Sequence, residues 1–379
     1  MNRLAKVAIA AACVALAASA CGNSSGSASS VNWAKATSAQ AGGGMDALVA
    51  AAKAEGTLNV ITLPDDWADY GTIMKSFTAK YGIKINDADP DGSSADEINA
   101  VQKDKSLPSA PDVLDVGNSH ALPYVSLFAP YEVQSWSDIP AALKDPNGAW
   151  YGDYGGYITI ACDAAKVAPA PCPTSFAQLV APANVSAYQG KVSIDGDPTA
   201  ANAAFSAVWA AALANGGSMS NIQPGISFFA TLKKNGEFNS TQDSESTIEQ
   251  GSTPIAIDWE FNNSQYAADL KKDGVDLKVV IPTDSLFSAY YDQAINKNAP
   301  HPAAARLWEE YLYSATGQND FMGGFARPVE FDAMQTAGTL DAADEADLPK
   351  VDGTPQFPTA AELTAAQNVV TADWPTQVG

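Results

Sequence analysis

Two short runs of acidic and aromatic residues are the chemically distinctive feature of this sequence. Asp258-Trp259-Glu260 directly follows Ile255 to Ile257, a β-branched run that predicts a buried strand. Tyr290-Tyr291-Asp292 comes later in the chain, beyond Pro282. Carboxylates attract cations, and an aromatic face adds about 0.5 to 2 kcal/mol of cation–π attraction at each contact. The two runs therefore indicate a binding site for a small cation, with Trp259 as its main aromatic side.

Further polar and aromatic residues follow other predicted strands. If parallel strands end at one edge of a sheet, these side chains gather beside helix N-termini, where small ligands bind. Several also have a purely structural interpretation: Ser94 and Thr199 suit helix caps, Asp197 suits a loop, and the aromatic residues suit a packed hinge. The full set of candidate ligand-binding residues is Asp66, Trp67, Ser94, Asn118, Asp197, Thr199, Asp258, Trp259, Glu260, Tyr290, Tyr291 and Asp292.

The sequence motifs give little support for a catalytic function. The chain has no G-x-S-x-G elbow, no P-loop and no H-E-x-x-H sequence. Of its two histidines, His120 is expected at the surface, and His301, between two prolines, is expected to cap a helix or face solvent. We therefore expect no enzyme, no cofactor and no resident metal. A secreted hydrolase that uses paired carboxylates stays open as the alternative.

Alternating strands and helices predict the elements that position these residues. The expected elements include a helix over Met45 to Glu55, strands at Thr57 to Leu63 and Val113 to Val116, and a final helix opening at Pro302. In that final helix Glu309 and Glu310 are expected to face away from the core. This alternation of strands and helices predicts an α/β fold with a mixed, mostly parallel sheet and helices on both faces.

The length of the chain suggests two lobes. We expect the first lobe over residues 45–155, the second over 156–283, and a return to the first lobe with the C-terminal helices over 284–379. The chain would then cross twice between the lobes, with the ligand in the cleft between them.

The N-terminus indicates export. Arg3 and Lys6 precede an apolar stretch and the small residues Ala18-Ser19-Ala20, so residues 1–20 are predicted to be a signal peptide. That junction with Cys21 resembles the lipobox of bacterial lipoproteins, and a Gly/Ser-rich stretch follows it. We expect Cys21 to carry a lipid and residues 21–44 to form a flexible tether; simple secretion, with Cys21 an ordinary residue, is the alternative.

Charge and the remaining cysteines fit an exported protein. Loss of Arg3 and Lys6 takes the formal net charge from −22 to −24, which argues against nucleic acid as a partner. Cys162 and Cys172 are separated by a short Pro- and Ala-rich loop and are expected to form a disulfide in an oxidising compartment. Two free thiols or half of a metal site are the alternatives.

The segment INKNAPHPAAARLWEEYLYSATGQ, from Ile295 to Gln318, carries a family resemblance. It resembles the C-terminal part of the extracellular solute-binding proteins of ABC importers, in the group that captures ferric iron, polyamines, thiamine or aminoalkylphosphonates. The resemblance implies the two-lobed type II periplasmic-binding-protein fold and a monomer. It also implies delivery of a small-molecule ligand to the transmembrane subunits of an ABC permease, from the extracellular face of the membrane.

The resemblance leaves three ligand classes open. Iron-binding members use adjacent tyrosines near the place held here by Trp259-Glu260-Phe261, whereas this chain has its tyrosine pair at Tyr290-Tyr291. Polyamine-binding members hold their ligand with aromatic sides and carboxylates, which this chain supplies, so a polyamine-like cation is favoured. An aminoalkylphosphonate would use helix N-termini such as those expected at Ser94 and Thr199.

Overall fold

The computed structural model describes residues 31–105, 107–355 and 357–379. The predicted signal peptide and Cys21 lie outside the described residues. The described end of the predicted tether is not free: residues 32–44 include the short 3₁₀ helix η1 (Trp33–Lys35), and Trp33, Ala36 and Ala39 are buried in the main core. The tether prediction is therefore wrong for residues 32–44, because an indole in this segment buries apolar area that Gly/Ser residues lack.

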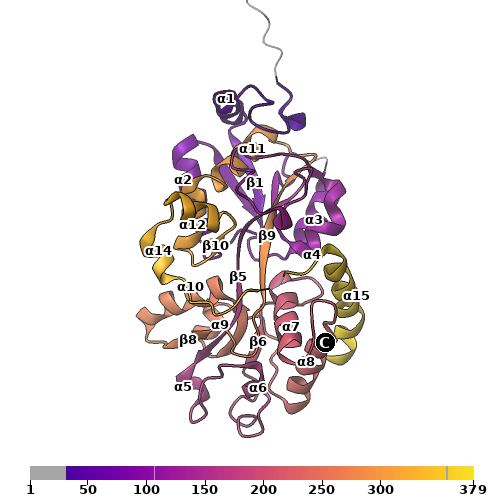
Figure 1. The fold of residues 1–379 in the computed structure, drawn as a ribbon, viewed down its shortest axis with the longest axis vertical. Helices are drawn as coiled ribbons and strands as arrows, with labels where there is room; N and C mark the ends of the chain where they lie inside the picture. Colours follow the sequence, from indigo (N-terminus) through magenta and orange to yellow (C-terminus); the bar gives the residue numbers. More distant parts are fainter. Residues whose placement is uncertain (1–30, 106, 356) are drawn as a thin grey trace, which may run out of the picture. The chain divides into compact units, whose positions relative to one another are not determined.

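Helices and strands alternate along the chain, as Figure 1 shows. Some of the helices end at a left-handed glycine, such as Gly56 after the first helix and Gly82 after the second, where a side chain would be strained. The helices are α1 (Met45–Glu55), α2 (Tyr70–Tyr81), α3 (Ser94–Asp104), α4 (Asn118–Ala121), α5 (Ala164–Val167), α6 (Phe176–Leu179), α7 (Asn202–Ala214), α8 (Gln223–Asn235), α9 (Glu245–Glu249), α10 (Glu260–Leu270), α11 (Pro302–Leu312), α12 (Ala315–Gly323), α13 (Phe331–Ala337), α14 (Ala342–Asp347) and α15 (Ala360–Gln377).

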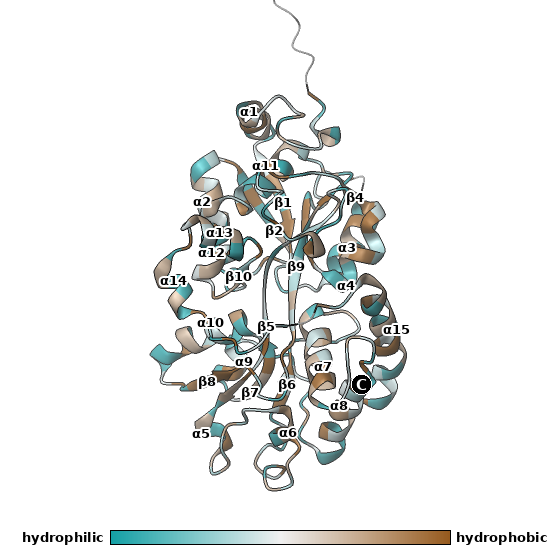
Figure 2. Cartoon of the chain, viewed as in Figure 1, coloured by the Kyte–Doolittle hydropathy of each residue, from teal (hydrophilic) through white to brown (hydrophobic). Residues whose placement is uncertain are grey.

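The strands form two sheets. β1 (Thr57–Ile61) and β2 (Lys84–Ala88) pair by themselves, and eight strands form a second sheet around the order β3-β9-β5-β7-β6. The strands of this second sheet are β3 (Val113–Gly117), β4 (Phe128–Ala129), β5 (Tyr151–Asp163), β6 (Val192–Ile194), β7 (Ile255–Trp259), β8 (Leu277–Val280), β9 (Ser288–Asn296) and β10 (Arg327–Pro328). In Figure 2 the region of strand β7 is largely coloured as hydrophobic, in keeping with a strand that is buried along its whole length.

The fold is mixed α/β and two-lobed, as predicted, but its strand directions differ from the mostly parallel sheet that we expected. Among the described strands, β1–β2 and β6–β7 pair in parallel, and the other pairs are antiparallel. The reason is β5, which pairs with β9 through its first half and with β7 and β8 through its second half, all antiparallel. Local patterns along the chain carry no information about such long-range pairings.

We propose that strands β5 and β9 connect the two lobes. We propose that the first lobe comprises β1–β4 with α1–α4 and α11–α14, and that the second comprises β6–β8 with α5–α10. Helix α15 contacts both α8 and α4. Its Trp374 packs edge-on against Phe229 and Phe238, with ring centroids 5.4 and 6.0 Å apart. Lys233 Nζ also donates to the carbonyls of Val378 and Gly379. These contacts hold the C-terminal helix against α8 and Phe238.

Helix α11 is buried on all sides. Its predicted start at Pro302 is confirmed, but Glu309 and Glu310 do not face solvent: both are buried. Glu310 accepts hydrogen bonds from the Tyr131 hydroxyl at 2.7 Å and the Gln134 backbone N–H at 3.1 Å. Both carboxyl oxygens of Glu309, by contrast, are buried without a hydrogen-bond partner.

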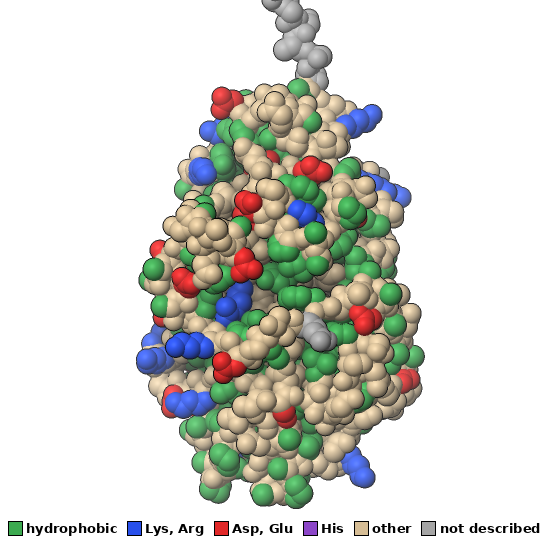
Figure 3. Space-filling view, viewed as in Figure 1, with side chains coloured by type: hydrophobic (Ala, Val, Ile, Leu, Met, Phe, Trp, Pro, Cys, Tyr) green, Lys and Arg blue, Asp and Glu red, His purple; other side chains and the backbone are tan. Residues whose placement is uncertain are grey.

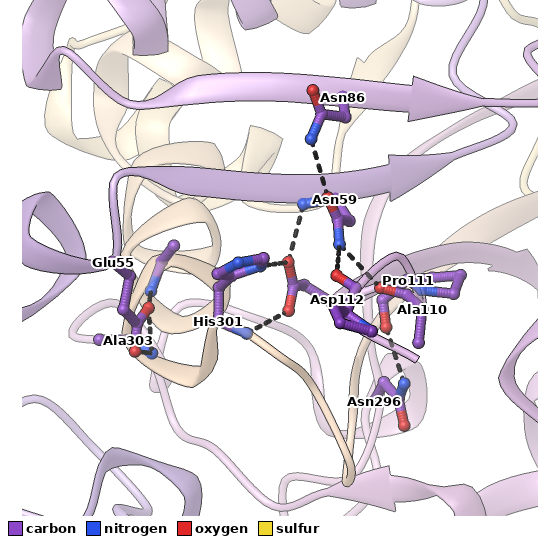
Figure 4. Close-up of polar contacts among 11 residues, drawn as sticks. Glu55, Asn59, Asn86, Ala110, Pro111, Asp112, Asn296, His301 and Ala303 are labelled. Atoms are coloured by element: carbon purple, nitrogen blue, oxygen red, sulfur yellow. Dashed lines mark hydrogen bonds and ion pairs between the residues drawn. The ribbon is translucent and has the colours of Figure 1, made fainter. Parts of the chain in front are cut away.

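A polar network fixes the start of α11 (Figure 4). Asp112, fully buried, accepts from the His301 backbone N–H at 2.6 Å, from His301 Nδ1 at 2.8 Å and from the Asn59 N–H at 2.7 Å. Glu55 accepts from the N–H groups of Ala303 and Ala304, which have no partner inside the helix. The Pro-His-Pro segment is thus a structural joint among α1, β1, β3 and α11, and the Asp112 hydrogen bond raises the pKa of His301.

The predicted disulfide between Cys162 and Cys172 is present. It joins the end of β5 to the loop before α6. Because it closes a short loop, we expect the Cys162→Ser/Cys172→Ser double variant to lose about 2 to 3 kcal/mol in the free energy of unfolding. Urea unfolding measures this loss, and the wild-type protein under reducing agent is the matched control. A double variant as stable as the oxidised wild-type protein would contradict the expectation.

On the face that Figure 3 displays, charged side chains are scattered among hydrophobic and neutral ones, and several basic side chains gather on the left of the lower half beside acidic ones. In the part of the chain that the structure describes, no helix combines the length and the apolar character needed to cross a bilayer.

Candidate functional site

A cavity of about 300 Å³ lies where strand ends from both lobes meet two helix N-termini. Thr62 follows β1, Asp115 lies on β3 and Asp195 follows β6, while Ser94 and Asn202 begin α3 and α7. This placement is the usual one for ligands in α/β folds, because strand ends leave a crevice and helix N-termini present free N–H groups.

Acidic side chains dominate the lining of this cavity. Its lining contains no Lys, Arg or His side chain among the described residues. The aromatic members are Trp67, Tyr266 and Tyr291. The carboxyl groups that line it are those of Asp66, Asp91, Asp96, Glu97, Asp115, Asp195, Asp197 and Asp243. A site with this lining repels anions and attracts a ligand that brings positive charge and N–H donors.

The carboxyl groups of the first lobe are held by α3 and β3. Ser93 caps α3 in a reciprocal capping box with Asp96, which places Glu97 in the first turn. Glu97 Oε2 accepts from the Asp115 N–H at 2.9 Å, and Asp115 Oδ2 accepts from the Tyr154 hydroxyl at 2.8 Å. The other oxygens, Glu97 Oε1 and Asp115 Oδ1, are buried and have no hydrogen-bond partner.

The second lobe contributes Asp195 and Asp243. Asp195 Oδ1 accepts from Gln242 Nε2 at 2.7 Å. Both carboxyl oxygens of Asp243 are buried without a hydrogen-bond partner. Unpartnered buried acceptors are costly, on the order of 1–3 kcal/mol each, and a ligand that donates to them recovers that energy.

Burial dominates the electrostatics of these acids. It raises the pKa of Asp115 to about 7 and that of Asp195 to about 6. Burial, followed by repulsion from neighbouring carboxylates, raises the pKa values of Glu97 and Asp243 well above their ordinary range. The free cavity therefore holds protons near neutral pH, and a bound cation would displace them.

Aromatic side chains pack between the cavity and the strands β5 and β9. Trp67 Nε1 donates to the Tyr154 hydroxyl at 2.5 Å, and the Trp67 ring meets Tyr291 edge-on at 5.6 Å. Tyr154, on β5, stacks on Tyr291, on β9, at 5.6 Å. Trp67 and Tyr291 thus line the cavity, and Tyr154 of β5 packs behind them.

The lobes touch beside the cavity. Gly117, at the end of β3, faces Asn202, at the start of α7, so closely that a Cβ on Gly117 would lie 2.1 Å from Asn202 Cγ. Ser119 Oγ donates to Asn202 Oδ1 at 3.3 Å. Only glycine fits at position 117 while the lobes are in this contact.

Part of the predicted site lines the cavity and part lies around it. Five of the candidates are lining residues: Asp66, Trp67, Ser94, Asp197 and Tyr291. The remaining candidates, which are not among the lining residues, are Asn118, Thr199, Asp258, Trp259, Glu260, Tyr290 and Asp292.

The acidic run of β7 lies in the layer behind the cavity. Trp259 is fully buried; it stacks on Phe261 at 5.9 Å and meets Tyr291 edge-on at 6.2 Å. Asp258 Oδ2 accepts from Asn262 Nδ2 at 2.8 Å, and Glu260 pairs with Arg327 at 2.8 Å. In this structure Trp259 supports the Tyr291 side of the cavity, and a ligand in the cavity would meet the Tyr291 ring first.

The tyrosine pair is split between two places because successive residues of a strand point to opposite faces. Tyr291 lines the acidic cavity, whereas Tyr290 lines a small separate cavity of about 40 Å³ together with Asn118 and Phe357. Asp292, also next to Tyr291, accepts from Asn118 Nδ2 at 3.1 Å.

Three expectations about individual side chains need correction. The cap of α3 is Ser93; Ser94 is the first helical residue, and its Oγ accepts from the Gly117 N–H at 3.1 Å. Thr199 does not cap α7, whose N-cap is Ala201; its hydroxyl donates to Asp197 at 2.8 Å instead. His120 is buried rather than at the surface, and burial lowers its pKa to about 4.

Glu97, Asp115, Asp195 and Asp243 line the cavity but are not among the residues predicted from the sequence. Asp195 directly follows β6. The expectation that polar residues just past strand ends bind the ligand, which selected Asp197 two residues later, applied to Asp195 as well. Asp115 carried a different signal, since an acid in the middle of the buried strand Val113–Gly117 requires a functional or structural partner. Glu97 and Asp243 offered no such signal, because acids are common near helix starts.

No group of three or more His, Cys, Asp or Glu side chains is arranged to hold a metal ion within residues 31–105, 107–355 and 357–379. The acids of the cavity are numerous, but they do not converge on one point.

A family model for bacterial extracellular solute-binding proteins matches residues 125–352 of the chain. A search among curated proteins found no match to this chain. Among solved structures, the periplasmic binding protein P5PA has a TM-score of 0.65 at 16% identity, covering 86% of this chain and all of its own.

Two further structures have the same fold. The fructose-6-phosphate-bound periplasmic protein AfuA of Actinobacillus pleuropneumoniae has a TM-score of 0.63 at 18% identity, covering 84% of this chain and 99% of its own. Iron-bound HitA of Pseudomonas aeruginosa has a TM-score of 0.59 at 20% identity, covering 84% and 98%. At these identities the likeness concerns the fold.

Proposed function

Because the chain belongs to the bacterial extracellular solute-binding protein family, whose members bind solutes rather than catalyse reactions, we propose that it is the substrate-binding component of an ABC importer and captures a small organic cation. The observation that carries the choice of ligand is the cavity lining, which has eight carboxyl groups and no basic side chain among the described residues. Carboxylates supply charge and acceptors, and Trp67, Tyr266 and Tyr291 supply apolar and cation–π contact.

Capture proceeds by closure of the two lobes. Each lobe holds part of the lining, so the closed form makes contacts that an open form lacks, and a ligand shifts the population toward closure. The Gly117–Asn202 contact is one point at which the closed lobes meet. The closed, loaded protein then docks on the transmembrane subunits of its permease as a monomer.

Ferric iron is the first alternative ligand. It prefers oxygen ligands, and the structure of iron-bound HitA shares this fold. Against iron in this chain, Tyr290 and Tyr291 lie on opposite faces of β9 and line different cavities. An aminoalkylphosphonate is the second alternative, and its anionic group would face the carboxyl groups beside the N-termini of α3 and α7.

Thermal-shift screening of the exported protein tests this proposal. The panel comprises diamines and polyamines, Fe³⁺, aminoalkylphosphonates, thiamine and sugars, with NaCl at matched ionic strength as the control for nonspecific charge. A ligand at about 100 times its Kd adds roughly 2.7 kcal/mol, which gives a visible shift. We expect an organic cation to give the largest shift. If only Fe³⁺ or only phosphonates stabilise the protein, the cation proposal is wrong.

We also propose that Cys21, which lies outside the described residues, carries a lipid that anchors the protein at the extracellular face of the membrane. Cys21→Ala should then move the protein from the membrane fraction to the medium or leave it unprocessed, because the modified thiol is absent. Cell fractionation with mass spectrometry of the mature N-terminus checks this. A Cys21→Ala protein that is cleaved normally and still stays in the membrane fraction would rule out the lipid anchor.

A further inference from the structure

Tyr154 is a buried residue that does not line the acidic cavity, yet it contacts three residues that do. Its hydroxyl donates to Asp115 Oδ2 at 2.8 Å and accepts from Trp67 Nε1 at 2.5 Å. Its ring stacks on that of Tyr291 at 5.6 Å, with an angle of 5° between the ring planes. These contacts reach the loop after β1, strand β3 and strand β9. One side chain of β5 therefore joins the acidic and the aromatic parts of the lining.

Tyr154 lies in a β-bulge. Gly152 pairs with Asp292 of β9 and Gly155 pairs with Tyr290, so between these two pairs β5 advances three residues while β9 advances two. The extra residue of β5 falls in the stretch that contains Tyr154. A bulge breaks the alternation of side chains along a strand, and bulges are common beside functional sites because they redirect a side chain. The irregular backbone and the contacts of the hydroxyl thus point to the same residue.

The hydrogen bonds of the Tyr154 hydroxyl run in one direction. An indole N–H can only donate, so Trp67 uses the phenol oxygen as its acceptor, and the single phenol proton is donated to Asp115. Burial, followed by the charges of Asp115 and Asp153, raises the pKa of Tyr154 well above its ordinary value, so the phenol keeps its proton near neutral pH. Asp115 Oδ2 is therefore always offered a donor, whereas Asp115 Oδ1 is buried without a partner and remains available to a ligand.

We propose that Tyr154 is a positioning residue of the binding site, whose hydroxyl holds the Asp115 carboxyl group and the Trp67 ring in place for the ligand. This inference rests on the proposed function, in which the cavity binds a cation. Donation to a carboxyl group favours its charged form, which is the form that a cation needs. Without the hydroxyl, Asp115 Oδ2 and the Trp67 N–H would both lose the partner they have here, and burial would favour the neutral acid.

Tyr154→Phe tests this inference, because it keeps the stacked ring and removes the hydroxyl. The ligand-free mature protein is labelled with ¹³C at the aspartate carboxyl carbon and titrated by NMR, and the Asp115 signal is the one that Asp115→Asn removes. We expect the midpoint of the Asp115 titration to move upward by about one pH unit in Tyr154→Phe, the effect of losing one hydrogen bond to a charged group. The other titratable groups that interact with Asp115 are the same in both proteins: Tyr70 on α2, Glu97 on α3, Asp153 on β5, Tyr291 and Asp292 on β9, and Glu309 on α11.

Tyr313→Phe is the matched control. Tyr313 is buried, is not a lining residue, and donates its hydroxyl to the carbonyls of Tyr151 and Gly152 on the same strand, at 2.9 and 2.8 Å. This substitution also removes a buried hydroxyl that contacts β5, yet it should leave the titration of Asp115 unchanged. Circular dichroism melting verifies that both variants are folded. Equal shifts of the Asp115 titration in the two variants would mean that Tyr154 has a structural role alone.

Calorimetry with 1,4-diaminobutane, a small member of the diamine panel, relates this effect to binding. At pH 7 we expect Tyr154→Phe to weaken binding roughly 10-fold, because less of Asp115 is ionised and one contact that positions it is lost. The pH below which the affinity falls should move upward together with the Asp115 titration. In the Asp115→Asn background the same substitution should cause no such pH shift.

The outcomes separate this inference from the proposed function. If Tyr154→Phe leaves the Asp115 titration as it is in the wild-type protein, or shifts the pH dependence of binding equally with and without the Asp115 carboxyl group, the positioning role is wrong while cation capture stands. If the titration moves as expected and no diamine or polyamine binds to the wild-type protein, the placement of Asp115 by Tyr154 is confirmed and the proposed function is wrong.

Discussion

Gly117→Ala is expected to abolish tight ligand binding while leaving the protein folded. The backbone of Gly117 has φ −59°, which any residue adopts, so alanine causes no backbone strain. Its Cβ would, however, lie 2.1 Å from Asn202 Cγ and 2.4 Å from Asn202 Cβ, atoms too close to the helix backbone to move aside. The added methyl group would keep the lobes from reaching this contact. We therefore expect the affinity for 1,4-diaminobutane to fall roughly 100-fold or more.

Small-angle scattering and calorimetry measure this effect together. Wild-type protein should contract when ligand is added, and the Gly117→Ala protein should not. Gly323→Ala is the matched control, because the nearest atom that its Cβ would meet is 3.6 Å away. Unchanged affinity in Gly117→Ala would show that ligand capture does not need this contact.

A second substitution provides a rescue test. Asn202→Gly removes the three atoms that would meet the new methyl group, Cβ, Cγ and Oδ1, whereas Asn202→Ala keeps the Cβ at 2.4 Å. In a double-mutant cycle, Gly117→Ala should therefore be far less harmful in the Asn202→Gly background than in the Asn202→Ala background. Equal losses in both backgrounds would remove the steric explanation.

Acidification is expected to have opposite effects on the free protein and on cation binding. Burial raises the pKa of Asp115 to about 7 and that of Asp195 to about 6. Groups whose pKa is raised on folding stabilise the protein below their unfolded pKa, near 4, and this stabilisation is lost as the pH rises through 6 to 7. The free protein should therefore gain about 2 kcal/mol from Asp115 between pH 8 and pH 5.5.

Cation binding requires the ionised carboxylates, so its affinity should fall over the same range. With a pKa near 7 for Asp115, the affinity for 1,4-diaminobutane should drop roughly 30-fold from pH 8 to pH 5.5. His120, whose pKa burial lowers to about 4, opposes the gain in stability at low pH but does not line the cavity. Urea unfolding and calorimetry at both pH values measure the two trends, and Asp115→Asn should flatten both. An affinity that is constant or rises on acidification would contradict this assignment.

Features set by local sequence were predictable. Helix α1 ends before Gly56, α11 starts at Pro302, and Cys162 and Cys172 form the disulfide, because glycine, proline and a short loop act through neighbouring residues. The same reasoning placed Asp66, Trp67 and Asp197 after strand ends, and they line the cavity.

Features set by long-range pairing were not predictable in this way. The antiparallel pairing of β5 with β9 decides that Tyr291 faces the cavity and Tyr290 does not, and no local pattern fixes that register. Trp259 stood out because two acids flank it, yet it packs behind Tyr291, since a large aromatic side chain at a buried strand end gains more from packing than from exposure. Asp115 was hidden inside an apolar strand.

The central claim is that the acidic cavity binds an organic cation, and proton-linked calorimetry tests it most directly. The full mature protein is titrated with 1,4-diaminobutane near pH 7 in two buffers that differ in their heat of ionisation. We predict saturable binding at one site, with net release of protons as the cation displaces them from Asp115 and Asp195. Saturable binding of Fe³⁺ or a phosphonate with no heat from any diamine or polyamine would contradict the account.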